Sequence, residues 1–488
     1  MPNEKHDVII IGAGVVGCLT ARALSRYRLK VLLLEKASDV GTGASKANTA
    51  IVHAGYDPTP GTNKAKFNVA GNAMWDQLAG ELNFPFERRG DYVVAIGPEE
   101  LPILDELWER GKKNGVLGMK MISADEMRRR EPNINSQVSG ALWVSTGGIC
   151  DPFAVVAAAA ENAVMNSVEL MLETEALDFV KEGRRLVGVV TNRGTFPCRW
   201  VINCAGLYSD VIMRQAGLET DFKITPRKGE YYVFDRAKVS INNVLFPVPT
   251  PISKGIMVTT TVHGNTIAGP TAHNIKDKED TSVTPEGLEE VFAGAKKLLP
   301  SLDKGDVIAV FAGLRSSGST GDFVMEVPRE VEGFVNLAGI ESPGLTSAPA
   351  IAQWVVDALW EHGPKLEEKP DWDPIRPPRP RFRDLSPEEQ TLLIYSNSAY
   401  GRIVCRCETV TEGEIVAEVH TPVPARTYDG IKRRTRLGMG RCQGGFDTPR
   451  VIEILARELR ILPTKVTKKG PGSELLTRPA KVQGGCHA

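Results

Sequence analysis

The first hydrophobic run of the chain predicts a buried strand. Residues 7–11 read Asp-Val-Ile-Ile-Ile, a β-branched run typical of a strand covered on both faces of a parallel sheet. Apolar positions at helical spacing follow over residues 18–24, and a second apolar run covers residues 30–34. This strand, helix and strand predict the start of an α/β unit.

Later runs divide into two kinds. Residues 200–206 and 335–339 are apolar and end in small residues, which predicts further buried strands, and a helix is expected to begin at Pro349. Residues 229–234, 255–262 and 265–270 alternate instead, which predicts strands with one solvated face in a mostly antiparallel sheet. We expect the substrate to lie between this sheet and the buried strands.

The predicted fold class is therefore α/β plus α+β, with a Rossmann-type domain interleaved with a mostly antiparallel substrate domain. The first domain is expected over residues 1–365, with substrate-domain segments at about 80–150 and 220–325. Prolines cannot continue a helix or a central strand, so residues 366–398 are predicted to form a linker. A small helical, cysteine-containing domain is expected over residues 399–488.

Composition narrows the class of protein. The chain has 488 residues, of which 42% are hydrophobic and 24% charged, and its 59 basic and 60 acidic side chains give a net charge of −1. A nucleic acid partner is not expected, because the near-zero net charge gives no sign of the basic surface that such a partner needs. Glycines interrupt the apolar residues 7–24, so we predict no transmembrane segment and a cytoplasmic protein, and leave open membrane association through a partner.

A glycine motif follows the first strand. In Gly12-Ala13-Gly14-Val15-Val16-Gly17, Gly12 permits a tight turn, Gly14 lets a pyrophosphate approach the backbone, and Gly17 lets the helix pack on the strand. Glu35 ends the second strand, where an acid accepts hydrogen bonds from a ribose. The pattern predicts a dinucleotide site without choosing between FAD and NAD.

Residues 41–49 are rich in small polar side chains. Ser45 and Asn48 lie in this segment and are suited to wrapping a diphosphate and reaching toward a flavin ring. The alternative is a polar loop without a ligand.

Several separated motifs carry a resemblance to a known family. They are the glycine motif, Asn48-Thr-Ala-Ile-Val-His53-Ala-Gly55-Tyr56, Thr195-Phe-Pro-Cys-Arg-Trp-Val-Ile-Asn203-Cys-Ala205-Gly206 and Ile340-Glu-Ser-Pro-Gly344-Leu345-Thr346-Ser-Ala-Pro349-Ala. In this order they resemble the FAD-dependent family that contains glycerol-3-phosphate dehydrogenase, L-2-hydroxyglutarate oxidase and, more distantly, D-amino-acid oxidase, over about residues 5–360. The resemblance implies FAD as cofactor, with contacts at Ala205, Gly206, Gly344, Leu345 and Thr346.

Oxidation of an alcohol by flavin needs a base for the hydroxyl proton. His53 lies in the block that resembles the flavin-proximal segment of the family, and histidine titrates near neutrality, so it is the first candidate. His263 and His273 rank next. The alternative for His53 is a flavin contact without proton transfer.

An anionic substrate needs a cation. Arg315, in Phe311-Ala-Gly-Leu-Arg315-Ser-Ser, resembles the arginine with which the family binds the acidic end of its substrate. Lys228, in a block that resembles the glycerol-3-phosphate branch, is a candidate for a second positive charge.

These residues predict an FAD-dependent dehydrogenase that oxidises a small anionic secondary alcohol, with sn-glycerol 3-phosphate giving dihydroxyacetone phosphate as the leading reaction. The alternatives are an oxidase of L-2-hydroxyglutarate or another 2-hydroxy or amino acid, and a flavin electron-transfer subunit without turnover. The electron acceptor, whether a protein, a further subunit or a small molecule, stays open.

Cysteines gather near the end of the chain. Cys405, Cys407 and Cys442, with the helical segments around them, resemble the [2Fe-2S] domain of the bacterioferritin-associated ferredoxins, in which four cysteines hold the cluster. Asp447 stands where the fourth cysteine of that family is expected. The fourth ligand is therefore open between Asp447 and Cys486, and a zinc site or an empty site are the alternatives.

Overall fold

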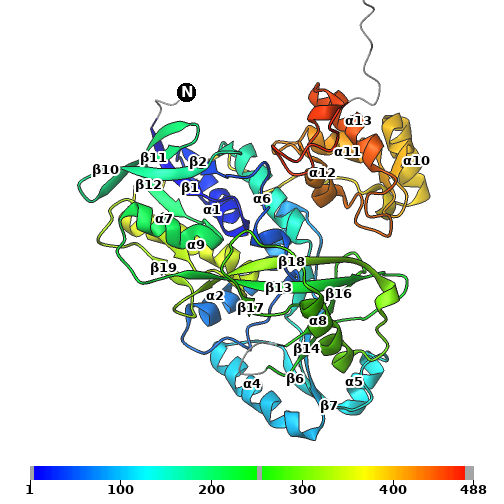
Figure 1. Cartoon of the computed structure of the whole chain (residues 1–488). Helices are drawn as coiled ribbons and strands as arrows, with labels where there is room; N and C mark the ends of the chain where they lie inside the picture. Colours follow the sequence, from blue (N-terminus) through cyan, green and yellow to red (C-terminus); the bar gives the residue numbers. More distant parts are fainter. Residues whose placement is uncertain (1–4, 250–254, 479–488) are drawn as a thin grey trace, which may run out of the picture. The chain divides into compact units, whose positions relative to one another are not determined.

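The computed structural model describes residues 5–249 and 255–478, and the chain divides into two compact units (Figure 1). The first unit comprises the residues up to Lys36 and Val40–Pro377. The second comprises Ala37–Asp39 and the residues from Pro378 onward. The predicted domain boundaries stay a prediction, and the two units are described separately below.

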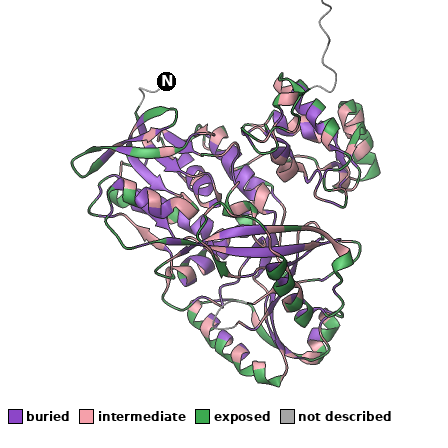
Figure 2. Ribbon diagram, viewed as in Figure 1, coloured by how far each residue is buried: buried purple, intermediate pink, exposed green. Residues whose placement is uncertain are grey.

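The first unit contains a parallel sheet, which includes the first strand that the structure describes. Its parallel strands lie in the order β9–β2–β1–β12–β20. They are β1 (His6–Ile11), β2 (Val31–Leu34), β9 (Glu169–Met171), β12 (Gly194–Asn203) and β20 (Phe334–Ala338). Most of their side chains are buried, as Figure 2 shows for the strands around β1, because helices and other strands cover both faces.

Helices and short antiparallel strands complete this layer. The helices are α1 (Val15–Ser25), α2 (Asn63–Asn72), α3 (Trp75–Leu82), α6 (Pro152–Met165), α7 (Ser209–Ala216) and α9 (Gly344–His362). Strands β10 (Ala176–Glu182), β11 (Arg185–Thr191) and β19 (Val324–Glu326) extend the sheet, and β3 (Ile51–Val52), β4 (Phe86–Glu87) and β8 (Gly148–Cys150) form a separate three-stranded antiparallel sheet. Helix α1 begins just after β1, at the carboxyl edge of the sheet, and packs against α6 and α9.

The second sheet of this unit is mostly antiparallel, as predicted. Its described order is β17–β13–β16–β15–β14–β5–β7–β6, with β18 paired to β13, and only β14 and β5 run parallel. The strands are β5 (Asp91–Ile96), β6 (Met119–Ser123), β7 (Val138–Val144), β13 (Ile224–Phe234), β14 (Val244–Pro247), β15 (Met257–Thr260), β16 (Thr266–Gly269), β17 (His273–Asn274) and β18 (Val307–Gly318). Helices α4 (Leu101–Asn114), α5 (Ala124–Arg130) and α8 (Pro285–Leu298) belong to the same part of the chain.

One helix begins earlier than its sequence pattern indicates. Helix α9 starts at Gly344, and Pro349 lies inside it rather than at its first position. Proline removes one backbone donor near the start of a helix, where the surrounding packing tolerates the loss. The early start brings Gly344, Leu345 and Thr346 into the first turn of the helix.

The segment predicted as a linker is anchored by side-chain contacts. Its first part is held within the first unit: Arg376 forms an ion pair with the fully buried Glu161, and the Trp372 indole donates to Ser25. Its second part contains helix α10 (Pro387–Ser396), which begins with a capping box formed by Ser386 and Glu389. The prolines limit regular structure in this segment, and side-chain contacts hold the chain in place.

The second unit is a small helical domain. It contains α10, the hairpin β21 (Ile403–Cys405) and β22 (Val410–Thr411), and helices α11 (Glu412–Val419), α12 (Tyr428–Thr435) and α13 (Thr448–Leu459). Its core includes Cys405, Ile415, Ile431, Val451 and Leu455. The small helical cysteine-containing domain predicted from the sequence is confirmed.

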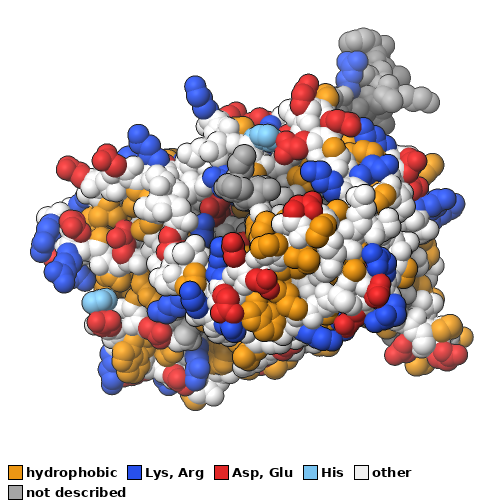
Figure 3. Space-filling view, turned by 90° about the horizontal axis from the view of Figure 1, so that it is seen from below, with side chains coloured by type: hydrophobic (Ala, Val, Ile, Leu, Met, Phe, Trp, Pro, Cys, Tyr) orange, Lys and Arg blue, Asp and Glu red, His pale blue; other side chains and the backbone are white. Residues whose placement is uncertain are grey.

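The surface agrees with the balanced composition. Basic and acidic side chains are intermixed on the face that Figure 3 shows. Within the described residues, no helix combines the length and the apolar character needed to cross a bilayer.

Candidate functional site

The glycine motif forms a turn in which backbone touches backbone. Gly12 has a φ of +101°, which favours glycine, and a Cβ on it would lie 2.6 Å from the carbonyl oxygen of Cys204. A Cβ on Gly17 would lie 1.9 Å from the carbonyl oxygen of Gly12. Side chains are therefore excluded at both positions, and β1, α1 and the end of β12 meet at this turn.

Two polar side chains lie at the same turn. Glu35, directly after β2, accepts a hydrogen bond from the backbone N–H of Ala13 at 2.8 Å. Ser45 accepts one from the N–H of Val15, in the first turn of α1, at 2.9 Å. A carboxylate beside a glycine turn and a hydroxyl at the start of a helix suit a ribose and a diphosphate respectively.

The residues at this turn fit a dinucleotide such as FAD. Gly14 leaves the backbone accessible, since the nearest atom to a Cβ built on it is the Ser45 hydroxyl at 3.2 Å. The first turn of α1 carries no acidic side chain that would repel a diphosphate. Gly12, Gly14, Gly17, Glu35 and Ser45, all predicted cofactor contacts, are brought together here.

Further contacts join the other predicted segments into one region. A Cβ on Gly313 of β18 would lie 2.1 Å from the carbonyl oxygen of Ala47, so this strand touches the loop that contains Ser45. The Ser316 hydroxyl donates to the carbonyl of Ile340, just before α9. Strand β18 therefore connects the loop after β2 with the start of α9.

Other predicted cofactor contacts have structural roles in this arrangement. The Asn48 amide donates to the carbonyls of Ala44 and Ser45 and accepts from the N–H of Ala50, so it shapes its own loop. Ala205 and Gly206 follow β12 beside the glycine turn, and Gly206 begins a short 3-10 helix with a φ of +55°. Direct contact of these residues with FAD stays a prediction.

The backbone of His53 is fixed from three sides. Its N–H donates to the Thr346 hydroxyl at 2.9 Å, and its carbonyl accepts from the side-chain amides of Asn68 and Asn72 in α2. Its Nε2 atom lies 3.5 Å from the Ser342 hydroxyl. The imidazole is thus held at the start of α9, close to the other predicted flavin contacts.

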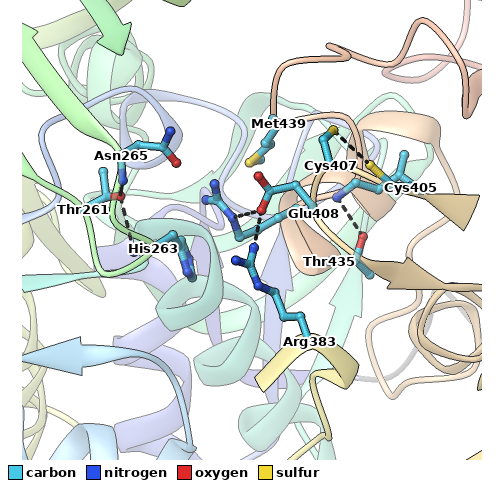
Figure 4. A network of polar contacts seen from close by, with 12 residues as sticks. Thr261, His263, Asn265, Arg383, Cys405, Cys407, Glu408, Thr435 and Met439 are labelled. Carbon is cyan, nitrogen blue, oxygen red and sulfur yellow. Dashed lines mark hydrogen bonds and ion pairs between the residues drawn. The ribbon is translucent and has the colours of Figure 1, made fainter. Parts of the chain in front are cut away.

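The two lower-ranked histidines lie in different surroundings. His263 has a side chain that is 6% exposed and an Nε2 atom 2.8 Å from the Asp151 carboxylate, and its backbone belongs to the turn shown with Thr261 and Asn265 in Figure 4. His273 is exposed and pairs with Glu290. Because His263 is bound to a buried carboxylate and His273 is exposed, His53 stays the first candidate for the base.

Arg315 lies beside a second arginine. Arg227 of β13 is directly opposite it in the antiparallel pair, and directly opposed residues share a face. Gly313 is two residues from Arg315 and therefore on that same face, which meets the loop at Ala47. Both residues therefore lie on the side of the sheet that meets the predicted flavin loop, and the Arg227 guanidinium donates from Nε to the Asn274 amide oxygen on β17.

The Arg315 guanidinium is oriented by backbone carbonyls. It donates to the carbonyls of Arg227, Lys228 and Thr271, while its Nη1 makes no hydrogen bond to any described residue. Tyr231 stacks on Phe311 with ring centroids 4.5 Å apart. Burial raises the pKa of Tyr231, whereas the positive charge of Arg315 lowers it. Arg315 is therefore positioned with one donor group open to an anion.

Lys228 points to the other face of the sheet. It is opposite Leu314 rather than Arg315, and its Nζ donates to Asp280 at 2.8 Å and to the carbonyl and hydroxyl of Ser282. Alternation along β13 places Arg227, not Lys228, beside Arg315. The geometry thus disfavours the predicted second charge at Lys228 and favours Arg227.

A cavity lies beside His53, between the turn after β3, helices α2 and α4, and β14. The residues that line it are His53, Gly55, Tyr56, Asp57, Pro58, Asn68, Val93, Leu107, Phe246, Pro247 and Pro249. Neither lysine nor arginine occurs among these described lining residues. The lining combines apolar side chains with Asp57 and Asn68, and its described residues offer no cation for an anionic group.

Three of the cysteines near the chain end come together in the second unit. The Sγ atoms of Cys405, Cys407 and Cys442 are 3.0 to 3.9 Å apart, and Figure 4 shows the contact between Cys405 and Cys407. Burial raises the pKa of the Cys405 and Cys442 thiols. Three thiols this close ionise together only when a cation offsets their charge, which is what a metal site requires.

The loop between α12 and α13 leaves room for these thiols. A Cβ on Gly440 would lie 2.9 Å from the Cys407 sulfur, and the N–H of Gly438 points to the Cys405 sulfur at 3.5 Å. Soft sulfur ligands with amide donors fit an iron–sulfur cluster. Asp447 adjoins this group, and Cys486 lies outside the described residues.

Some functional residues were missed by the sequence reasoning. Arg227 directly precedes the candidate Lys228, but the strand register decides which of the two residues lies opposite Arg315. Gly229 and Gly313 are directly opposed in the interior of two strands. Glycine inside a strand signals a close approach, and this signal could have indicated the contact between β18 and the loop at Ala47.

Comparison with known proteins agrees with this geometry. The family model described as FAD dependent oxidoreductase matches residues 7–358, and the model of the BFD-like [2Fe-2S] binding domain matches residues 403–457. A glycerol 3-phosphate dehydrogenase of Caloramator mitchellensis is 45% identical, over 97% of this chain and 99% of that protein. An L-2-hydroxyglutarate dehydrogenase of Arabidopsis thaliana is 31% identical, over 73% of this chain and 83% of that protein.

A solved structure shares the fold of the first unit. The FAD-bound L-α-glycerophosphate oxidase of Mycoplasma pneumoniae is 34% identical and superimposes with a TM-score of 0.73. It covers 77% of this chain and 99% of its own. The match to the Caloramator protein extends over nearly all of this chain, whereas the match to this oxidase leaves almost a quarter of it uncovered.

The glycine turn yields a prediction for cofactor binding. We expect Gly14→Ala to lower FAD content by at least tenfold, because the added methyl group meets Ser45 where the diphosphate approaches the backbone. Gly80→Ala is the matched control, since a Cβ on this exposed helical glycine touches nothing. Flavin absorbance per chain in the purified proteins measures the effect, and equal flavin in both variants would contradict it.

Proposed function

Because this chain belongs to the FAD-dependent oxidoreductase family, we propose that it oxidises sn-glycerol 3-phosphate to dihydroxyacetone phosphate. FAD, when bound, supplies the hydride acceptor. The proposal is supported by the near full-length similarity to a glycerol 3-phosphate dehydrogenase. L-2-hydroxyglutarate, the substrate in the name of a more distant relative, is the alternative.

The observation that carries the proposal is the arginine pair on one face of β13 and β18. Arg227 and Arg315 stand opposite each other on the side that meets the loop at Ala47. Two guanidinium groups suit the two negative charges of a phosphate ester, because each offers a planar set of donors. Arg315 Nη1 is the donor group we assign to the phosphate.

His53 is the residue to which we assign the hydroxyl proton. Its Nε2, near the Ser342 hydroxyl, takes the proton while the carbon gives up its hydride. Thr346, Asn68 and Asn72 hold the backbone of His53, which fixes the position from which the imidazole projects. The first turn of α9 contributes its N–H dipoles, which stabilise negative charge on a reduced ring.

We also propose that electrons leave through an acceptor other than oxygen. The relative that extends over the second unit is named a dehydrogenase, whereas the oxidase structure covers only 77% of this chain. The thiol group of the second unit supports an electron-carrying role for it, with a protein or a further subunit as acceptor. A cytoplasmic location, with membrane association through such a partner, is part of the same proposal.

Anaerobic mixing with single substrates tests the reaction. We expect sn-glycerol 3-phosphate to bleach the flavin absorbance and to yield dihydroxyacetone phosphate in equal amount. Bleaching by L-2-hydroxyglutarate or an amino acid alone would instead support the alternative oxidase reaction. A flavin that none of these compounds reduces would indicate an electron-transfer subunit without turnover.

Replacement of the arginine tests substrate binding. We expect Arg315→Ala to raise the KM for glycerol 3-phosphate by ~10- to 100-fold, since a lost hydrogen bond to a charged group costs about 1.5–3 kcal/mol. Arg315→Lys should recover part of this loss, because it restores the charge without the planar donor set. Steady-state kinetics with an artificial acceptor measure both.

The control for this experiment is Arg193→Ala. Arg193 is exposed on the hairpin between β11 and β12 and pairs with Glu173. An unchanged KM in Arg315→Ala, equal to that of the control, would remove Arg315 from the substrate site.

Replacement of the histidine tests proton transfer. We expect His53→Asn to slow anaerobic flavin reduction by ~100-fold or more, because a positioned base contributes about 10²–10⁴. The fall in rate on acidification, which reports protonation of the base, should disappear as well. Stopped-flow absorbance across pH measures both effects, and His420→Asn, at an exposed residue paired with Glu458, is the control. A wild-type profile in His53→Asn would place the base elsewhere.

A further inference from the structure

Asp447 adjoins the three clustered thiols of the second unit. Its Oδ2 atom lies 3.7 Å from the Sγ of Cys442, and the residue is 1% exposed. The sulfurs of Cys405, Cys407 and Cys442 already lie within 3.9 Å of one another. A buried carboxylate beside the Cys442 sulfur, at the edge of the three clustered thiols, is a candidate fourth ligand.

The direction of this carboxylate is unusual for its position in the helix. Asp447 is the residue that precedes α13, where aspartate normally accepts a hydrogen bond from the next backbone N–H groups. It makes no such capping bond. Its Oδ1 accepts from the Tyr428 hydroxyl at 2.9 Å instead, while Oδ2 faces Cys442. Pro449, the second residue of the helix, has no N–H to donate, and the carboxylate is oriented toward the Cys442 thiol.

We propose that Asp447 is the fourth ligand of a [2Fe-2S] cluster held by Cys405, Cys407 and Cys442. A carboxylate carries the same single negative charge as a thiolate, so this ligand set keeps the net charge of a four-cysteine site. The three thiols release their protons to solvent when iron binds. An oxygen ligand is harder than sulfur and favours ferric iron.

Tyr428 is a positioning residue for this ligand. Its hydroxyl holds Oδ1 of Asp447, which leaves Oδ2 to the metal, as hydrogen bonds to the outer atoms of ligands generally do. The loop makes space for that hydroxyl with glycines: a Cβ on Gly444 would lie 2.5 Å from it, and one on Gly438 3.0 Å. The ring of Tyr428 is buried in the core of the unit.

The full-length protein, purified without oxygen, tests the assignment. We expect about two iron and about two sulfide per chain in the wild type, and at least a twofold loss of both in Asp447→Ala. Asp447→Cys should keep the iron and shift the midpoint potential of the cluster upward, because sulfur stabilises ferrous iron better than oxygen does. Tyr428→Phe should keep the iron and change the electron paramagnetic resonance spectrum after dithionite reduction.

Two control variants separate this role from a general effect on the unit. Asp429→Asn removes a nearby carboxylate that pairs with Lys468, and it should leave iron, spectrum and potential unchanged. Cys486→Ala removes the cysteine that lies outside the described residues, and it should also have no effect.

Three results would overturn the proposal. Full iron and a wild-type spectrum in Asp447→Ala would show that the carboxylate is no ligand, and loss of iron in Cys486→Ala would move the fourth ligand to that cysteine. Zinc in place of iron in the wild type would reject the cluster. None of these measurements involves glycerol 3-phosphate, so their failure would leave the proposed reaction standing.

Discussion

The close approach of backbone to backbone at the carboxyl edge of the parallel sheet governs the first unit. Side chains are excluded at Gly12 and Gly17 because the carbonyl oxygens of Cys204 and Gly12 occupy the space that a Cβ would need. This packing sets the start of α1 directly over the ends of β1 and β12, with Glu35 and Ser45 at its edge. A helix start of this kind suits a diphosphate, and the N–H groups of Ala13 and Val15 beside it are bonded to Glu35 and Ser45.

Side chains alternate between the two faces of the antiparallel sheet, and the arginines proposed to bind the substrate lie on one of these faces. One face of β13 and β18 carries Arg227 and Arg315 and meets the loop at Ala47, and Lys228 faces the other side, where it pairs with Asp280. The residues proposed to bind FAD, to take the proton and to bind the anion thus come from segments far apart in sequence. In the second unit the proposed ligands come from two segments, with Cys405 and Cys407 in the hairpin and Cys442 and Asp447 in the loop that leads to α13.

The sequence predicted the parts of the fold whose signals are local. Apolar β-branched runs identified β1 and β12, and alternation identified β13 and β16, because burial on one or two faces is written directly into the residue pattern. Pro349 was misplaced as the start of α9, and the capping box at Ser386 within the proline-rich segment was overlooked. Lys228 could not be assigned to a face without the register, which depends on the partner strand.

A crystal structure of the protein reduced by sn-glycerol 3-phosphate, with FAD bound, tests the central claim most directly. The account predicts the diphosphate at Gly14 and the first turn of α1, and a flavin ring whose substrate side faces both His53 and Arg315. A diphosphate bound away from the glycine turn would contradict it, as would a ring from which His53 and Arg315 lie on opposite sides.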